Sequence, residues 1–127
     1  MILQILKPER KKYRETFLKD KPKKKKKRRI RCKFCNSKVT DSSKIISISN
    51  SSNHTFVNPA GIVYNITCYS EADGCIVVGE KMSEFSWFNG FFWQFAMCKE
   101  CLNHLGWFYS SDDKYFFGLV SEYLIEE

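Results

Sequence analysis

Long apolar runs are missing from this sequence, and no stretch approaches the roughly 20 apolar residues that a transmembrane helix requires. The apolar start at residues 1–6 is too short for the core of a secretory signal, and its positive charges follow it instead of preceding it. We therefore expect no membrane partner and a cytoplasmic location. In such a reducing compartment the six cysteines favour metal binding over disulfides.

Basic residues are scarce over most of the chain. Residues 32–127 hold six lysines and arginines against eleven acidic residues, a net charge of −5, whereas residues 1–31 hold fifteen against three, a net of +12. The overall charge of +7 therefore comes from one segment. A basic folded surface for nucleic acid is not indicated.

The unbroken basic run at residues 23–29 is typical of a solvated tail that repels itself. We interpret residues 1–31 as a flexible, disordered basic arm and residues 32–127 as one folded domain. The alternative role for residues 7–31 is a weak, non-specific contact with polyanions, or a nuclear-import signal in a eukaryotic cell.

From residue 32 onward, short β-rich runs alternate with Ser, Asn, Asp and Gly, which predicts a mostly β, antiparallel domain. A turn at Asp73-Gly74 indicates a hairpin, and residues 121–125 indicate a helical turn. Strands are expected at residues 44–48, 54–57, 62–69, 75–78, 91–97, 105–109 and 115–120.

Two Cys-x-x-Cys pairs, Cys32 with Cys35 and Cys98 with Cys101, carry the strongest chemical signal. Each pair can place two thiolates on one tetrahedral cation, and the two pairs together make a closed four-cysteine zinc shell. Because no position remains open for water, we expect one structural, non-catalytic zinc ion per chain. The alternative is a set of reduced core thiols.

Three further residues are candidates for metal binding or thiol chemistry. His104 follows the second pair by three residues and is an alternative zinc ligand, although a structural histidine is the preferred interpretation. Cys68 and Cys75 have no Lys, Arg or His between them, whereas Glu71 and Asp73 would raise a thiol pKa. We expect two buried structural cysteines, with a redox pair as the alternative.

Six aromatic residues lie within nine positions in Phe85-Ser-Trp-Phe-Asn-Gly-Phe-Phe-Trp93. Core strands seldom concentrate aromatic residues in this way around an Asn-Gly turn. Together with Trp107, these tryptophans form either part of the core or the walls of a cage for a flat or cationic ligand. Periodicity alone leaves both interpretations open.

These motifs, together with Phe56-Val-Asn-Pro-Ala-Gly61, His104-Leu-Gly-Trp107 and Phe116-Phe-Gly-Leu119, resemble the thalidomide-binding CULT domain of cereblon, and more closely its stand-alone bacterial relatives. The resemblance covers residues 32 to about 125. It implies a β-tent, in which two antiparallel sheets meet at an angle and are pinned by zinc on four cysteines. By the matching pairs these are Cys32, Cys35, Cys98 and Cys101.

The resemblance also implies a non-catalytic ligand site. In the family three tryptophans form a cage for a cyclic imide, a further aromatic residue closes its floor, and backbone groups bind the imide edge. Such ligands include glutarimide, dihydrouracil- or uridine-like rings and a cyclised Asn or Gln at a protein terminus. The ligand-binding residues implied are Asn58, Pro59, Phe85, Trp87, Trp93, Trp107 and Tyr109.

At the position of Phe85 cereblon has a histidine, so side-chain contacts made there do not carry over. The full cereblon receptor also has an N-terminal domain and a segment that docks a ubiquitin-ligase adaptor, for which this chain has no room. The resemblance therefore does not imply a ligase adaptor as partner.

Two other functions remain open. Methionine-R-sulfoxide reductases share the tent architecture and the zinc cysteines, but they need a nucleophilic cysteine on a late strand. No cysteine follows Cys101, and the position would fall within residues 115–119. A nucleic-acid-binding zinc protein would use the basic arm for affinity and the aromatic residues for base stacking. The net charge of −5 on residues 32–127 opposes that function.

Overall fold

The computed structural model describes residues 27–127, so most of the expected basic arm, residues 1–26, lies outside the described residues. The strands are β1 (Arg29–Cys32), β2 (Lys38–Asp41), β3 (Asn53–Val57), β4 (Val63–Tyr69), β5 (Cys75–Met82), β6 (Phe92–Cys98), β7 (His104–Ser110), β8 (Tyr115–Val120) and β9 (Leu124–Glu126). Two short 3₁₀ turns are η1 (Ser42–Lys44) and η2 (Ser121–Tyr123). Within this part of the chain no helix has the length and apolarity that a membrane crossing would need.

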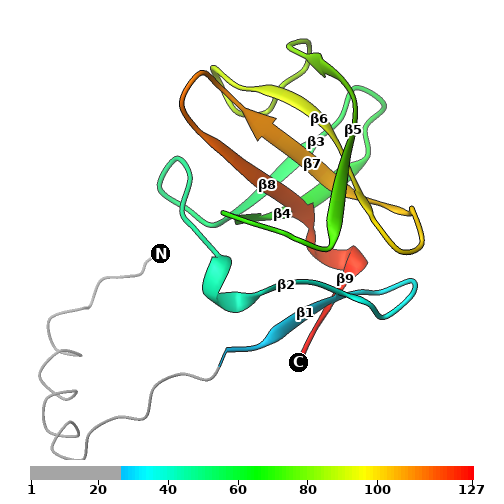
Figure 1. The fold of residues 1–127 in the computed structure, drawn as a ribbon. Coiled ribbons are helices and arrows are strands. Elements are labelled where there is room, and N and C mark those ends of the chain that lie inside the picture. Colours follow the sequence, from blue (N-terminus) through cyan, green and yellow to red (C-terminus); the bar gives the residue numbers. More distant parts are fainter. Residues whose placement is uncertain (1–26) are drawn as a thin grey trace, which may run out of the picture.

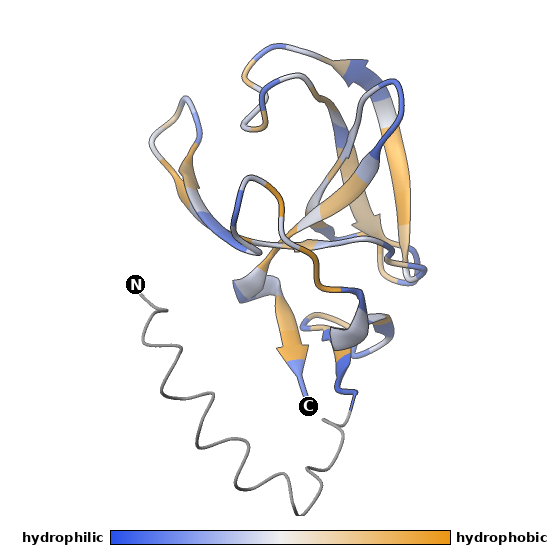
Figure 2. Ribbon diagram, turned by 90° about the vertical axis from the view of Figure 1, so that its left-hand side faces the viewer, coloured by the Kyte–Doolittle hydropathy of each residue, from blue (hydrophilic) through white to orange (hydrophobic). Residues whose placement is uncertain are grey.

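The strands form two antiparallel sheets (Figure 1). The larger sheet has six strands in the order β3-β4-β8-β7-β6-β5, and the smaller has three in the order β2-β1-β9. In Figure 2 the hydrophobic segments follow the strands, and most connecting loops are hydrophilic. The predicted fold class, a mostly β chain with two antiparallel sheets, is confirmed.

The fold begins earlier in the sequence than predicted. In β1 the side chains of Ile30 and Cys32 are fully buried, whereas the arginines between and before them face outward. Arg31 and Arg29 lie 2.6 and 3.4 Å from the carboxylate of Glu127 on the neighbouring C-terminal segment. The boundary expected after residue 31 therefore falls inside a strand, because the period-two alternation continues into the basic run.

The strand expected at residues 44–48 is wrong, and β2 was not expected. The Asp41 side chain accepts a hydrogen bond from the Ser43 N–H at 2.9 Å and caps a 3₁₀ turn there. The isoleucines that follow make only isolated bridges, from Ile45 to Tyr69 and from Ile48 to Ser51. Two β-branched residues in a row thus favoured a strand locally, but they meet only the end of β4, where the Ile46 N–H donates to the Cys68 carbonyl at 3.0 Å, and no ladder forms.

The hairpin expected at Asp73-Gly74 is also wrong, since β4 pairs with β3 and β8 while β5 pairs with β6. Gly74 has a different reason to be glycine. A Cβ atom there would lie 2.2 Å from the carbonyl oxygen of Lys38, and the Gly74 N–H donates to the Val39 oxygen at 2.9 Å. This close approach joins the β4–β5 loop to the smaller sheet.

The buried residues form two clusters that share the central strands of the larger sheet. One cluster contains Cys32, Cys98 and Leu105, and the other contains Tyr109 and Phe116 with the tryptophans packed around them. In β6 successive side chains alternate between the two faces of the sheet, so Cys98 joins one cluster and Trp93 the other. In β7 an irregular register at Leu105 lets this residue and Tyr109 face different clusters. Cys98 on β6 and the pocket residues Trp107 and Tyr109 on β7 are thus held by neighbouring strands, and Cys32 reaches the cluster of Cys98 from β1.

Candidate functional site

The four cysteines of the two Cys-x-x-Cys pairs lie together, with all four sulfur atoms within 4.8 Å of one another. The Cys32 and Cys101 sulfurs are 3.8 Å apart, and those of Cys35 and Cys98 are 3.6 Å apart. A tetrahedral zinc ion with Zn–S bonds of about 2.3 Å separates its sulfur ligands by about 3.8 Å. The donor set and its spacing therefore fit one zinc ion with a closed shell.

The two knuckles have the same backbone geometry. The Asn36 N–H donates to the Cys32 carbonyl at 2.7 Å, and the Leu102 N–H donates to the Cys98 carbonyl at 2.7 Å. Asn36 and Leu102 also share a left-handed conformation, with φ of 68° and 63°. That conformation costs a residue such as leucine about 1–2 kcal/mol. Its occurrence in both knuckles means that the two pairs present their sulfur atoms on equivalent turns.

The polar surroundings of the cluster stabilise thiolates, the form that binds a metal. Burial alone would raise the pKa of Cys98, but hydrogen bonds from the Ser37 hydroxyl and from backbone N–H groups lower it to about 6. The Asn103 side chain lowers the pKa of Cys101 in the same way. Burial raises the pKa of Cys32 to about 12, so this ligand needs the charge of a bound cation to ionise.

The other candidates for metal binding or redox chemistry, His104, Cys68 and Cys75, are held by packing and hydrogen bonds within the domain. The His104 Nε2 atom lies 2.8 Å from the Gly106 carbonyl oxygen, and its ring packs edge-on against Trp107 at 4.8 Å. His104 is not part of the cysteine cluster. Cys68 and Cys75 belong to different core clusters, and burial raises the pKa of each thiol to about 12. Neither thiol is primed for nucleophilic or redox chemistry.

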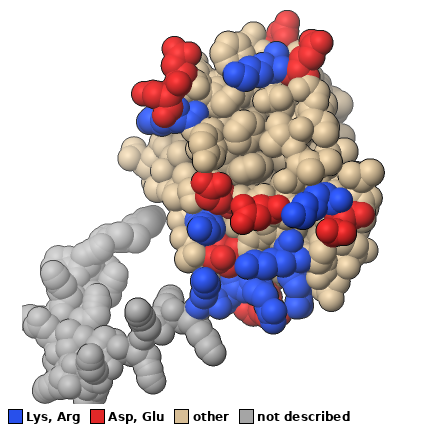
Figure 3. All heavy atoms as spheres, viewed as in Figure 1, with Lys and Arg blue, Asp and Glu red and all other residues tan. Residues whose placement is uncertain are grey.

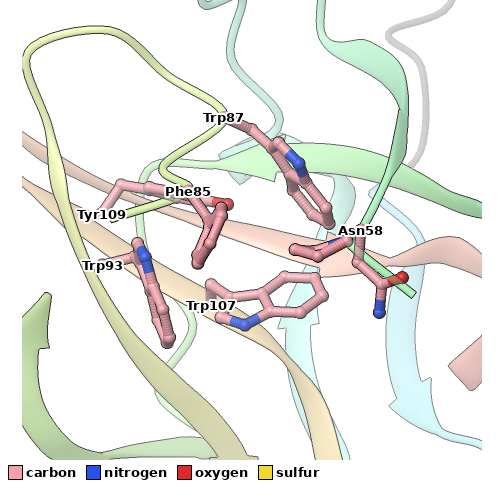
Figure 4. A pocket seen from close by; sticks show the side chains of 7 residues that line it. Asn58, Phe85, Trp87, Trp93, Trp107 and Tyr109 are labelled. Atoms are coloured by element: carbon pink, nitrogen blue, oxygen red, sulfur yellow. The ribbon is translucent and has the colours of Figure 1, made fainter. Parts of the chain in front are cut away.

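One cavity of about 250 Å³ brings together the ligand-binding residues that the resemblance implied (Figure 4). They come from the β3–β4 loop, from the β5–β6 loop and from strands β6 and β7. The lining residues are Asn58, Pro59, Phe85, Trp87, Trp93, Trp107 and Tyr109. Their contact with a ligand stays a proposal, but the chain does gather them around one space.

The lining residues are arranged by depth. Tyr109 is 2% exposed and forms the floor. Its ring centroid lies 4.8 Å from that of Phe88 and 5.1 Å from that of Phe116. The three tryptophans are half-buried walls, and Phe85 and Pro59 are the exposed residues at the mouth. A cavity with a buried aromatic floor and an exposed rim is suited to enclosing one end of a molecule.

Contacts within the protein fix the walls. The Trp87 and Trp107 rings meet edge to face, with centroids 5.0 Å apart and an angle of 80°. Trp93 stands apart from them in Figure 4, and its indole N–H donates to the Glu84 carbonyl at 2.8 Å. This bond ties the β5–β6 loop to β6, so the walls are set before any ligand binds.

Two supporting residues were missed by sequence reasoning. The Phe56 ring stacks on Trp87 at 4.8 Å with an angle of 10°, on β3 just before the pocket loop. The ring of Tyr64 on β4 packs against both tryptophans, with its centroid 5.9 Å from that of Trp87 and 5.3 Å from that of Trp107. The signal was present, because the alternation along residues 62–69 places Tyr64 on the apolar face of that strand.

The polar groups around the cavity are few and mostly backbone. Within residues 27–127 the backbone N–H and C=O groups of Phe85 and Trp87 take part in no hydrogen bond. The Asn58 side-chain oxygen accepts from the N–H groups of Ala60 and Ile62, both at 2.9 Å, and so holds its own loop. The amide NH₂ group of the Asn58 side chain remains available as a donor.

No charged side chain lines the cavity. In Figure 3 the charged residues gather toward the upper and lower parts of the visible face, with a broad uncharged area between them. Burial raises the pKa of Tyr109 well above its ordinary value, so the phenol at the floor stays neutral. The site can enclose a neutral ligand by ring contacts, and its lining offers neither a nucleophile nor an ionised acid or base.

Comparison with known proteins adds two findings. A family model described as Yippee zinc-binding/DNA-binding/Mis18, centromere assembly, matches residues 29–127. Protein cereblon of Drosophila grimshawi is 34% identical over 97 residues, covering 70% of this chain and 14% of that protein. The corresponding protein of Drosophila melanogaster is 33% identical over 97 residues, covering 70% of this chain and 17% of that protein. Protein cereblon of Xenopus tropicalis is 36% identical over 78 residues, covering 60% of this chain and 17% of that protein.

These matches confirm the resemblance to cereblon that the aromatic and cysteine motifs indicated. The chain spans less than a fifth of the length of these relatives. The similarity therefore concerns one domain and does not extend to the activity or partners of the whole relatives.

Proposed function

This chain belongs to the Yippee-Mis18 family, and from that premise we propose that it is a non-catalytic domain that binds a neutral cyclic imide in its aromatic pocket. The family's description names zinc binding, and four cysteines with tetrahedral spacing supply one structural zinc site. The zinc belongs to the core between the sheets, and the pocket on the other face takes the ligand.

The observation that carries the proposal is the convergence of Trp87, Trp93 and Trp107 on one small cavity above Tyr109. A single glutarimide or dihydrouracil ring is smaller than the cavity volume of about 250 Å³ and fits within it, whereas drug-sized ligands occupy pockets of roughly 300–1,000 Å³. The cavity thus has room for one ring, and any larger ligand must extend out of the mouth.

The chemistry of an imide ring matches the two kinds of surface in the pocket. One edge carries an N–H group between two carbonyls, and it can pair with the free backbone groups of Phe85 and Trp87. The opposite edge carries weakly polarised CH₂ groups, which pack favourably against indole faces. A dihydrouracil ring or a cyclised Asn or Gln at a protein terminus would present both edges. A pyrimidine nucleoside such as uridine would present the imide edge, with two ring C–H groups opposite it.

An enzymatic function of the sulfoxide-reductase type lacks support in this pocket. The late strand β8 contains no cysteine, and Cys68, the thiol in the aromatic cluster, is fully buried with a pKa raised to about 12. A closed four-thiolate zinc shell also leaves no position for activating water. Binding is therefore the function that the described residues favour.

Titration with glutarimide and dihydrouracil, followed by tryptophan fluorescence, tests the proposal. The chain's three tryptophans all line the pocket, so intrinsic emission reports on this site alone. We expect a saturable change for both rings. An unchanged spectrum, together with no heat of binding in calorimetry, would refute imide binding.

N-Methylation of the imide is expected to weaken binding by at least tenfold. The methyl group removes a buried hydrogen bond and also pushes carbon against backbone carbonyls, so the combined loss should be at least about 1.4 kcal/mol. N-Methylglutarimide and glutarimide should be compared by calorimetry on the same protein. Equal affinities would mean that the N–H edge is not recognised and that the cage assignment fails.

Deletion of residues 1–26 is expected to leave imide affinity within about threefold of the full chain. All the zinc and pocket residues lie in the described part of the chain, which starts at residue 27. Deletion of residues 1–31 is the matched control, and it should unfold the domain because it removes most of β1 and the buried Ile30. Loss of binding in a folded 27–127 fragment would show that the arm contributes to the site.

A further inference from the structure

The β5–β6 loop contains the chain's single Asn-Gly pair, Asn89-Gly90. Both residues are exposed, and they form the middle of a β-turn in which the Phe91 N–H donates to the Phe88 carbonyl at 3.0 Å. Gly90 has a φ of 86°, and a Cβ atom at this position would have no neighbour within 4 Å. Glycine is thus needed here for its backbone angle, and the tip of the turn stands clear of the rest of the domain.

The peptide group between Asn89 and Gly90 is not held by the protein. Among residues 27–127 neither the Asn89 carbonyl nor the Gly90 N–H takes part in a hydrogen bond, and the Asn89 side-chain amide has no partner there either. The central peptide group of such a turn can therefore rotate without breaking the bond from Phe91 to Phe88. This rotation brings the Gly90 nitrogen up to the side-chain carbonyl carbon, Cγ, of Asn89.

The surroundings of the turn leave space for that approach. A hollow of about 270 Å³ lies against the turn, and its lining includes Asn89, Gly90 and the two serines Ser83 and Ser86. No charged side chain lines this hollow. Because Gly90 has no side chain, nothing shields its nitrogen from the Asn89 amide, and because both residues are exposed, water reaches them freely.

We propose that Asn89 is a site of spontaneous covalent modification, that its side-chain amide is lost through a succinimide formed with the Gly90 nitrogen, and that the product loosens the β5–β6 loop. The Gly90 nitrogen attacks Asn89 Cγ, the new C–N bond closes the ring, and the Cγ–NH₂ bond breaks with release of ammonia. Water then adds to either ring carbonyl and opens the ring to aspartate or isoaspartate. The reaction needs water alone and no bound ligand, so it is independent of imide binding.

The isoaspartate product changes the length of the backbone in the turn. In isoaspartate the chain runs through the side-chain CH₂ and Cγ, so an extra backbone atom separates Phe88 from Phe91 and the 3.0 Å bond between them is lost. Phe88 is 4% exposed, and its ring centroid lies 4.8 Å from that of Tyr109 and 5.0 Å from that of Phe116. Loosening the turn therefore weakens the packing of a core residue, whereas aspartate at position 89 adds only an exposed negative charge.

Peptide mapping by mass spectrometry, on the full chain incubated at mildly alkaline pH and physiological temperature, tests the modification. Asn89 should lose its amide before any of the six other asparagines, with aspartate and isoaspartate as products. Two internal controls are Asn50-Ser51, which is exposed but has a side chain on the second residue, and Asn58-Pro59, in which proline has no N–H to attack. Asn89→Gln should keep its amide over the same period, because a ring with one more atom closes more slowly.

Thermal unfolding tests the consequence for the loop. The isoaspartyl protein, separated by chromatography, should unfold about 4–8 °C below the fresh wild type, the shift expected for the loss of about one hydrogen bond in a domain of this size. Asn89→Asp has the same charge without the longer backbone, and it should stay within about 3 °C of the fresh wild type. If another asparagine is modified before Asn89, the modification site is refuted. If the isoaspartyl protein unfolds together with Asn89→Asp, the role of the turn is refuted.

Discussion

Replacing one zinc ligand by Cys98→Ser is expected to abolish stoichiometric zinc binding and to unfold or aggregate the domain. Structural zinc contributes on the order of 10 kcal/mol in small zinc domains, which is comparable with the entire stability of about 5–15 kcal/mol of a typical domain. Cys98 is fully buried, and its sulfur lies within 4.8 Å of the three other ligand sulfurs. Circular dichroism and metal analysis of the purified variant measure both effects.

Cys75→Ser is the matched control for that experiment. Cys75 lies directly opposite Cys98 in the β5–β6 pair and is not part of the sulfur cluster. The same Cys-to-Ser change should therefore keep one zinc per chain and cost about 1–2 kcal/mol at most. A folded, zinc-free Cys98→Ser protein, or a wild-type protein that stays folded after chelation, would contradict the structural role of the metal.

Removing one wall by Trp107→Ala is expected to weaken glutarimide binding by about ten- to a hundredfold or more. The variant loses the ring contact with the ligand and also the edge-to-face contact that supports Trp87 at 5.0 Å. Tyr64 and His104, which pack on Trp107, lose a neighbour as well. Calorimetry is the appropriate measurement, because the variant also loses one of the three emitting tryptophans.

Phe92→Ala serves as the control for an aromatic truncation on the same sheet. Phe92 lies next to Trp93 in β6, is 42% exposed and does not line the cavity. We expect its affinity for glutarimide to stay within about threefold of the wild type. Similar losses in both variants would point to general destabilisation, and unchanged affinity in Trp107→Ala would exclude Trp107 as a wall.

The metal site was predictable because its signal is local. A Cys-x-x-Cys spacing brings two sulfurs together within a single turn, so each half of the site is encoded by four consecutive residues. No separate signal was needed to predict that the two halves come together, because a single cation with four ligands requires both pairs at one place. Strands with clear alternation, such as β4, were predictable for the same local reason.

The errors fall where pairing partners decide the structure. The isoleucines after Lys44 have strand propensity, but only a neighbouring strand of sufficient length turns propensity into a ladder, and here only the end of β4 meets them. The Asp73-Gly74 turn was recognised correctly as a turn, yet it connects two strands that pair elsewhere. Chain neighbours in a turn carry no information about which distant strands will be neighbours in the sheet.

Composition, cysteine spacing and motif resemblance together were sufficient to determine a zinc-containing, mostly β domain and a short list of pocket residues. Only the tertiary structure decided which aromatic residues of the β5–β6 loop are core and which are pocket. Phe88 is 4% exposed and Phe85 is 72% exposed, although they are three residues apart in one loop. The direction of each ring depends on backbone angles and on hydrogen bonds to distant strands, such as that from Trp93 to Glu84, and periodicity within the loop cannot reveal them.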